Sequence, residues 1–160
     1  MPIVIDGYNL LRYVINSNEG YSGLSDIQIC RIIRVYLRRI GDKAVIVFDG
    51  TGPRDKTPFE NLDPLEVVFS GGNKEADEVI ETKILVSTAP KRLIIVSNDR
   101  RIIAAARRRR SASAKCEIFW AQLTKVLESH ASSAVPQEKY NGLSAAETEQ
   151  WIKSFGLQEQ

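Results

Sequence analysis

Short apolar runs that lead to an aspartate recur along the chain. They lie at residues 2–6, 43–48 and 91–97, and the acids are Asp6, Asp49 and Asp99. Apolar runs of this length, bounded by turn-forming residues, are typical of buried strands. Ligands of open α/β sheets bind outside the carboxyl ends of the strands. The pattern therefore predicts that several carboxylates gather at one edge of one sheet.

The rest of the hydrophobic pattern alternates between helices and strands. Two further strands are expected at 65–70 and 115–119. The apolar spacing predicts helices at 9–15, about 24–40, 75–87, 99–110 and 120–128. Residues 49–64 lack periodicity and are expected to form a long exposed loop. Strands that alternate with helices in this way indicate an α/β fold, with a parallel sheet covered by helices on both faces.

Composition narrows the class of protein. The 160 residues are 43% hydrophobic and 26% charged, with a net charge of +2, as in an ordinary globular domain. No apolar stretch is long enough to span a bilayer, and a signal peptide is not apparent, so we expect a cytoplasmic protein. Cys30 and Cys116 are far apart without a CxxC spacing and are expected to be reduced and buried. Because His130 is the only histidine, a histidine-rich metal site or a Ser-His-Asp triad gains little support.

The candidate chemistry is that of oxygen ligands. Four aspartates form the candidate site, namely Asp6, Asp49, Asp77 and Asp99; the nearby polar residues are Asn9, Glu78, Ser97 and Asn98. Carboxylates gathered without Cys or His suit the hard cations Mg²⁺ or Mn²⁺. A divalent ion held in this way can activate water and stabilise an in-line displacement at phosphorus.

Other phosphate chemistries fit this sequence less well. The chain has neither a GxxxxGK[ST] loop nor a GxGxxG turn, which cradle nucleoside triphosphates and dinucleotides. A phosphatase of the haloacid dehalogenase type needs a second aspartate where this chain has Tyr8. A phospho-receiver domain needs an early pair of acids, and that pair is missing.

Four short motifs carry a resemblance to a known family. They are Ile-Asp-Gly-Tyr-Asn at 5–9, Val-Phe-Asp at 47–49, Lys-Glu-Ala-Asp-Glu at 74–78 and Val-Ser-Asn-Asp at 96–99. Over residues 1–128 the chain resembles the YacP-like NYN domains, which belong with the PIN-like ribonucleases. The resemblance implies a PIN-like three-layer α/β/α sandwich with a mostly parallel central sheet. It also implies a divalent-metal acidic site and endonucleolytic cleavage of RNA, in some members on translating ribosomes.

Carried over by position, the resemblance makes Asp6, Asp77 and Asp99 the metal ligands, and Asn9 and Asp49 further members of the catalytic set. Each residue also has a structural interpretation. Asn9 and Asp99 are suitable helix caps, and Asp77 complements the dipole at the start of its helix. The residues alone leave both interpretations open.

Candidate RNA-binding residues surround these acids. Arg100 and Arg101 adjoin Asp99, and the predicted set also contains Arg107, Arg108, Lys74 and Tyr8. Arginines bind phosphate backbones, but the run 107–110 also suits the end of a helix. Tyr8 is suited to stacking on a base or to packing beneath the loop.

The C-terminal part of the chain is expected to be separate from the main domain. We predict a nuclease domain over 1–130, a linker over 131–143 and an amphipathic helix over 144–157 that carries Trp151. The leading hypothesis is an endoribonuclease that uses Mg²⁺ or Mn²⁺. One alternative is an RNA- or ribosome-binding module with little or no catalytic activity, and another is an interaction protein that uses the C-terminal helix. The sequence does not indicate the RNA or the oligomeric state.

Overall fold

A computed structural model gives the structure of the chain and describes residues 2–17 and 19–134. Within them a five-stranded sheet has the order β3-β2-β1-β4-β5, and every neighbouring pair is parallel. The strands are β1 (Ile3–Asp6), β2 (Ala44–Phe48), β3 (Leu65–Phe69), β4 (Ile94–Val96) and β5 (Ala112–Ala114). The predicted α/β class with a parallel sheet is confirmed.

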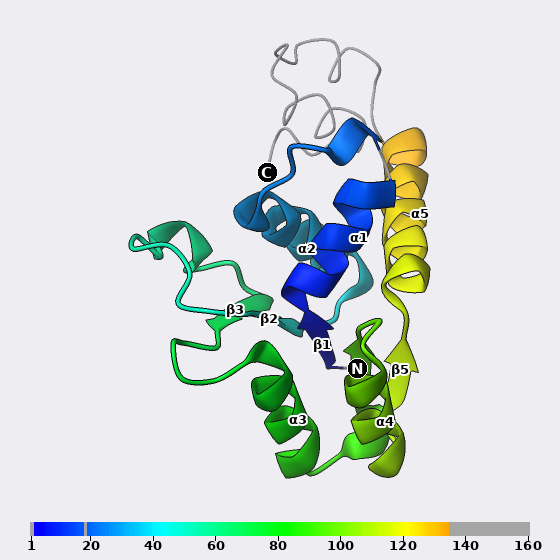
Figure 1. The fold of residues 1–160 in the computed structure, drawn as a ribbon. Helices are drawn as coiled ribbons and strands as arrows, with labels where there is room; N and C mark the ends of the chain where they lie inside the picture. Colours follow the sequence, from blue (N-terminus) through cyan, green and yellow to red (C-terminus); the bar gives the residue numbers. More distant parts are fainter. Residues whose placement is uncertain (1, 18, 135–160) are drawn as a thin grey trace.

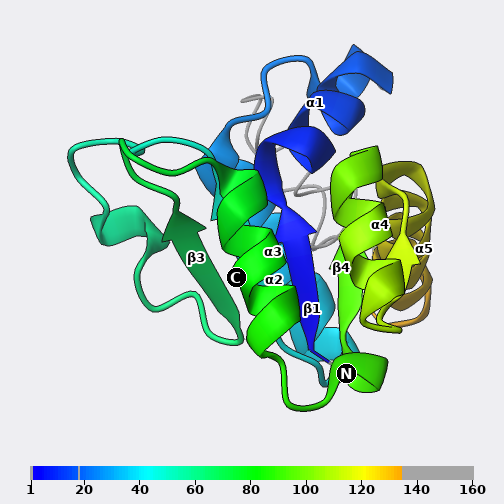
Figure 2. The same cartoon turned by 60° about the horizontal axis from the view of Figure 1, so that its bottom comes forward.

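Helices cover both faces of the sheet (Figures 1 and 2). One layer contains α1 (Gly7–Ser17), α2 (Asp26–Ile40) and α5 (Cys116–Ala134), which contact one another. The other contains α3 (Ala76–Val86) and α4 (Arg100–Arg108). A separate hydrophobic cluster lies under each layer, so the expected three-layer α/β/α sandwich is confirmed.

The central strand, β1, shows why the hydrophobic pattern predicted this part of the sheet. β1 pairs with β2 on one side and with β4 on the other, and Ile5 lies level with Ile46 and Val96. Side chains of a strand covered on both faces are apolar on both faces, so β1 reads as a continuous hydrophobic run. Because the three strands are parallel and in register, their carboxyl ends meet at the same edge of the sheet.

The predicted helix over about 24–40 is also confirmed. Ser25 caps α2 in a capping box, in which its hydroxyl accepts from the Gln28 N–H and the Gln28 side chain accepts from the Ser25 N–H. Gly41 ends the helix with a φ of +70°, a left-handed conformation that glycine adopts without a steric penalty. Local sequence signals therefore set both ends of this helix.

The predicted strand at 115–119 is wrong, because α5 begins at Cys116. The buried residues of this stretch recur at helical spacing: Cys116, Phe119, Trp120, Leu123 and Leu127. The fifth strand lies earlier, at Ala112–Ala114, and its three small residues carry no strand-like pattern.

Shorter elements complete the fold. The 3₁₀ turns are Glu19–Tyr21, Thr57–Phe59 and Pro90–Arg92, and the second lies in the predicted loop 49–64. Cys30 and Cys116 are free and buried, as predicted. Across 2–17 and 19–134, no helix is long and apolar enough to cross a membrane. α5 continues to Ala134, so the stretch predicted as a linker begins in a helix. The predicted helix over 144–157 lies outside the described residues.

Candidate functional site

The predicted acids come together in one pocket. A cavity of about 180 Å³ is lined by Asp6, Tyr8, Asn9, Arg12, Asp49, Glu75, Ala76, Asp77 and Asp99. Its four aspartates come from the end of β1, the residue after β2, the first turn of α3 and the residue before α4. The end of β1 and the starts of α3 and α4 lie at the same edge of the sheet in Figure 2, and β2 is the parallel neighbour of β1. The five residues predicted as the catalytic set are therefore neighbours in the structure.

Asp6 lies deepest in this pocket, at 7% exposed. Burial, together with the negative charges of Asp77 and Asp99, raises the pKa of its carboxyl group to about 6. The Ser97 hydroxyl donates to Oδ2 of Asp6 at 2.9 Å, and this bond favours the charged form. The carboxylate is thus held in place by hydrogen bonds in surroundings that disfavour its charge.

Ser97 connects two of the acids. Its hydroxyl oxygen accepts from the backbone N–H of Asp99 at 3.0 Å while its proton goes to Asp6. Asp99 caps α4, because its Oδ1 accepts from the Arg101 N–H at 2.8 Å. The predicted capping role of Asp99 is therefore present, together with its place in the pocket.

Asn9 is not a helix cap, because α1 begins at Gly7 and places Asn9 in the first turn. Its Oδ1 accepts from the backbone N–H of Asn98 at 2.9 Å and from the thiol of Cys116 at 3.3 Å. The side chain of Asn98 in turn accepts from the Cys116 N–H at 2.8 Å. This network ties α1 and the start of α5 to the loop that carries Asp99.

Asp49 and Asp77 approach from the opposite side. Oδ1 of Asp49 accepts from the N–H of Ala76, the first residue of α3, at 2.9 Å and from the Ser70 hydroxyl at 3.3 Å. Asp77 directly follows Ala76 and lines the same pocket. Burial first, and then the negative charge of Asp99, raise the pKa of the Asp77 carboxyl group.

Arg12 is a pocket residue that the sequence pattern did not identify. It lies four residues after Tyr8 and three after Asn9, so all three share one face of α1. The sequence predicted a helix over 9–15, which leaves out Tyr8, whereas α1 begins at Gly7. The shared face of Tyr8, Asn9 and Arg12 was therefore not predicted. Tyr8 packs on Phe48, with the ring centroids 4.9 Å apart, and also lines the pocket.

The predicted RNA-binding cations are distributed over a wider area. Arg100 is exposed at the start of α4. Arg101 is bound to Glu81 through two hydrogen bonds of 2.7 and 3.1 Å, so it can meet a phosphate only by sharing or leaving that carboxylate. Lys74 is exposed just before α3 and is not among the residues that line the pocket. Arg107 and Arg108 lie at the far end of α4.

The ligand atoms that the pocket offers are of the chemical type that a hard cation prefers. Its acidic side chains are carboxylates. Burial raises the pKa of the nearby Cys116 thiol to about 12, so this sulfur stays protonated. Oxygen ligands of this type select Mg²⁺ or Mn²⁺. In the part of the chain that the structure describes, no three Asp, Glu, His or Cys side chains are grouped closely enough to hold a metal ion as they stand. The carboxylates would have to move closer together to enclose one.

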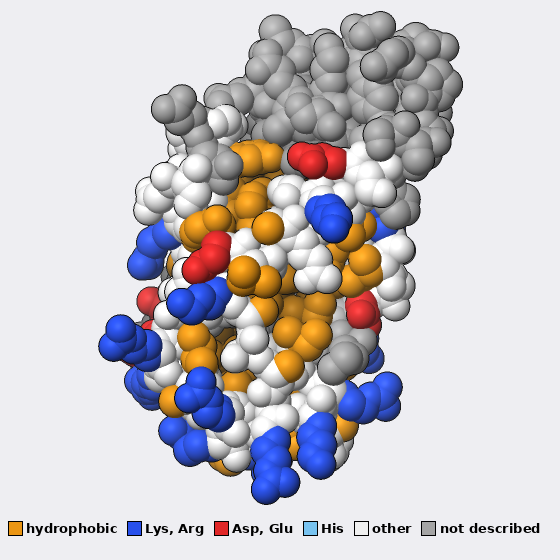
Figure 3. Space-filling view, turned by 90° about the vertical axis from the view of Figure 1, so that its right-hand side faces the viewer, with side chains coloured by type: hydrophobic (Ala, Val, Ile, Leu, Met, Phe, Trp, Pro, Cys, Tyr) orange, Lys and Arg blue, Asp and Glu red, His pale blue; other side chains and the backbone are white. Residues whose placement is uncertain are grey.

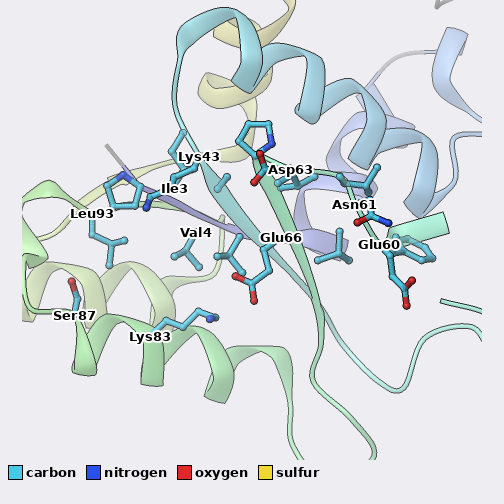
Figure 4. A pocket seen from close by; sticks show the side chains of 18 of the residues that line it. Ile3, Val4, Lys43, Glu60, Asn61, Asp63, Glu66, Lys83, Ser87 and Leu93 are labelled. Atoms are coloured by element: carbon cyan, nitrogen blue, oxygen red, sulfur yellow. The ribbon is translucent and has the colours of Figure 1, made fainter. Parts of the chain in front are cut away.

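A larger cavity, of about 890 Å³, lies at the other end of the sheet (Figure 4). Lys83 on α3 and Glu66 on β3 face it from opposite sides, and Lys43, Glu60 and Asp63 also line it. Its charges are mixed and it lies near the amino ends of β1, β2 and β3. Because the acids converge at the carboxyl edge instead, the smaller pocket is the better candidate site.

The family assignment follows from residues 3–154, which match the model of the YacP-like NYN domain. The chain belongs to this family. NYN domains are generally nucleases, and such nucleases typically use divalent metals. The match confirms the resemblance recognised from the four motifs, and it extends beyond residue 128.

Two solved structures have the same fold as this NYN domain. They are Rae1 (YacP) from Bacillus subtilis, with a TM-score of 0.66, and its W164L mutant, with a TM-score of 0.60. Both are 17% identical to this chain; the matches cover 98% and 97% of this chain and 92% of each Rae1 chain. No curated protein matches the sequence.

Proposed function

We propose that this NYN domain is a divalent-metal-dependent endoribonuclease whose reaction takes place in the acidic pocket. The observation that carries the proposal is the convergence of Asp6, Asp49, Asp77 and Asp99 from four elements onto one cavity. Burial, and after it mutual repulsion, raises the pKa of Asp6 and of Asp77. A bound cation relieves repulsion of this kind, so the arrangement is suited to a site that is completed by a metal.

Asp6, Asp77 and Asp99 are the residues that would hold Mg²⁺ or Mn²⁺. When bound, the ion would supply an activated water and stabilise the charge that develops on the phosphate. Ser97 positions Asp6 and the backbone of Asp99 relative to each other. Asn9 fixes the Asn98 backbone beside them. These uncharged groups keep the carboxylates in place without adding to their repulsion.

Cations and an aromatic ring at the rim would position the RNA. Arg12 lines the pocket and is exposed, so its guanidinium is available to a phosphate beside the scissile bond. Arg100 is exposed one residue after Asp99. Tyr8, held against Phe48, is placed to contact a base. Asp49 anchors α3, and so positions Asp77. If the reaction follows the PIN-like pattern, it leaves a 5′-phosphate and a 3′-hydroxyl.

Cleavage of RNA in Mn²⁺ or Mg²⁺, with and without EDTA, tests this proposal. We expect cleavage by the wild-type chain to require the ion, and Asp6→Asn and Asp99→Asn to abolish it. Glu78→Gln is the matched control, because Glu78 is an exposed acid next to Asp77 that does not line the pocket. Cleavage that persists in both aspartate variants would contradict the proposal that the acidic pocket is the active site.

A second candidate function is RNA or ribosome binding with little catalysis. It is favoured by the spacing of the acids, since no three such groups of the described residues are close enough to hold an ion as they stand. In that case the wild-type chain would bind RNA in EDTA, fail to cleave it in Mn²⁺ and show no heat of Mn²⁺ binding in calorimetry. Saturable Mn²⁺ binding that is lost in Asp99→Asn would exclude this alternative.

A further inference from the structure

A second charged surface lies at the edge of the sheet opposite the acidic pocket. It consists of five exposed cations, Lys91, Arg92, Arg107, Arg108 and Arg110, which we call the basic ridge. They belong to the connections that precede β4 and β5. The segments 87–97 and 104–115 contain no Asp or Glu. Among the described residues, no ion-pair partner is found for any ridge side chain.

Hydrogen bonds hold the two connections together. The guanidinium of Arg109, the half-buried member of the run, donates to the Ser87 carbonyl at 3.1 Å. The Ala112 N–H donates to the Leu93 carbonyl at 3.0 Å. The ridge cations therefore project from a rigid frame built by the ends of α3, α4 and the sheet.

Arg110 occupies a position at which glycine is usual. The N–H of Arg110 donates to the Arg107 carbonyl, and the N–H of Ser111 donates to the Ala106 carbonyl, which together form the Schellman ending of α4. Arg110 has a φ of +58° there. The same chain ends α2 with Gly41 at a φ of +70°. A left-handed arginine is strained, and strained residues are concentrated at functional sites.

The ridge is separate from the pocket. The eight-residue step from Arg100 to Arg108 corresponds to about 12 Å along α4, and Asp99 lies at the near end. Arg100 and Arg107 are seven residues apart and so lie on the same face of α4. In Figure 3, Lys and Arg side chains gather at the lower end of the face shown, the end at which α4 finishes in Figure 1.

We propose that the basic ridge binds the phosphate backbone of RNA at a distance from the scissile bond. The inference rests on the proposed function for its choice of polyanion. Four of the five cations are arginines, which match phosphate oxygens bidentately. The segments 87–97 and 104–115 contain no aromatic residue, and aromatic anchors are the usual centre of a protein interface. RNA therefore fits the ridge better than an acidic protein does.

The test is the affinity of the full chain for a labelled single-stranded RNA of about thirty nucleotides. It is measured by fluorescence anisotropy in EDTA, at several salt concentrations. The ridge variant is Arg107→Gln, Arg108→Gln, Arg110→Gly. We expect at least about tenfold weaker binding at low salt, and a slope of log Kd against log salt that is shallower by about two. Arg110→Gly alone should unfold at a temperature no lower than the wild type, because glycine adopts the left-handed conformation without strain.

A matched control removes three exposed cations elsewhere, with Arg31→Gln, Arg38→Gln and Lys125→Gln on α2 and α5. We expect this variant to bind RNA within about twofold of the wild type. An equal loss in the control, or unchanged affinity and salt slope in the ridge variant, would overturn the inference. The inference would also be overturned if the ridge variant bound RNA as the wild type does but no longer sedimented with phosphatidylserine vesicles. Binding in EDTA needs no turnover, so a failure of the nuclease assay leaves this result intact.

Discussion

At Asp6, the stability of the fold and the proposed chemistry have opposite requirements. The carboxyl group is buried and faces two other acids, and its pKa is raised to about 6. In Asp6→Asn the amide oxygen can still accept from Ser97 without a charge. We expect Asp6→Asn to increase the free energy of unfolding at pH 7.5 by about 1–3 kcal/mol. Urea unfolding in EDTA measures the difference, and a destabilised variant would contradict this description of the pocket.

The same pKa predicts how the difference depends on pH. An acid whose pKa is higher in the folded state opposes folding above that value, and the penalty disappears as the folded form takes up its proton. The advantage of Asp6→Asn should therefore be full above pH 6 and shrink as the pH falls from 6 towards 4. Urea unfolding of both proteins across this range tests the window. An advantage that is constant from pH 7.5 to pH 4 would contradict it.

Gly7 is required by a close approach rather than by an unusual backbone angle. A Cβ atom at this position would lie 2.5 Å from Cδ1 of Phe48 and 2.8 Å from the carbonyl oxygen of Val47. Phe48 is fully buried and supports Tyr8. We expect Gly7→Ala to lower the free energy of unfolding by about 1–3 kcal/mol. Gly20→Ala is the control, since nothing lies within 4 Å of the added carbon.

At the scale of elements, α3 is held by a carboxylate from another part of the chain. Its N-cap residue, Glu75, makes no side-chain cap, and Asp49 accepts from the first N–H instead. Asp49→Ala should therefore destabilise the fold by about 1 kcal/mol, whereas Asp49→Asn keeps an acceptor oxygen and should be close to neutral. Thermal unfolding distinguishes the two. Equal stability in both variants would contradict the capping role.

Helices and strands with buried faces were predictable from the sequence, and edge elements were not. α2 carries an apolar face and ends at Gly41, and the prediction of about 24–40 therefore lies close to the observed Asp26–Ile40. β5 is an edge strand of three small residues, so no periodicity marks it. The apolar residues of α5 that follow were assigned to that strand instead. Hydrophobic patterning reports burial, and it is weakest where an element has little to bury.

At the scale of the whole molecule, parallel topology explains why the acids were predictable. Asp6, Asp49 and Asp99 follow strands whose carboxyl ends share one edge, so three strand limits place three carboxylates together. The placement of Arg12 needed the exact start of α1. The hydrogen bonds of Ser97 to Asp6 and Asp99 could not be predicted from the sequence, because no hydrophobic periodicity indicates where a serine hydroxyl points.

The central claim is that this pocket is a metal site. The most direct measurement is calorimetric titration of the full chain with Mn²⁺, because it does not require the RNA to be known. It compares Asp77→Asn with Glu78→Gln, two neighbours of which only Asp77 lines the pocket. We predict that the wild type and Glu78→Gln bind Mn²⁺ with similar affinity and that Asp77→Asn binds it at least about tenfold more weakly. Equal affinity in all three proteins would contradict the claim.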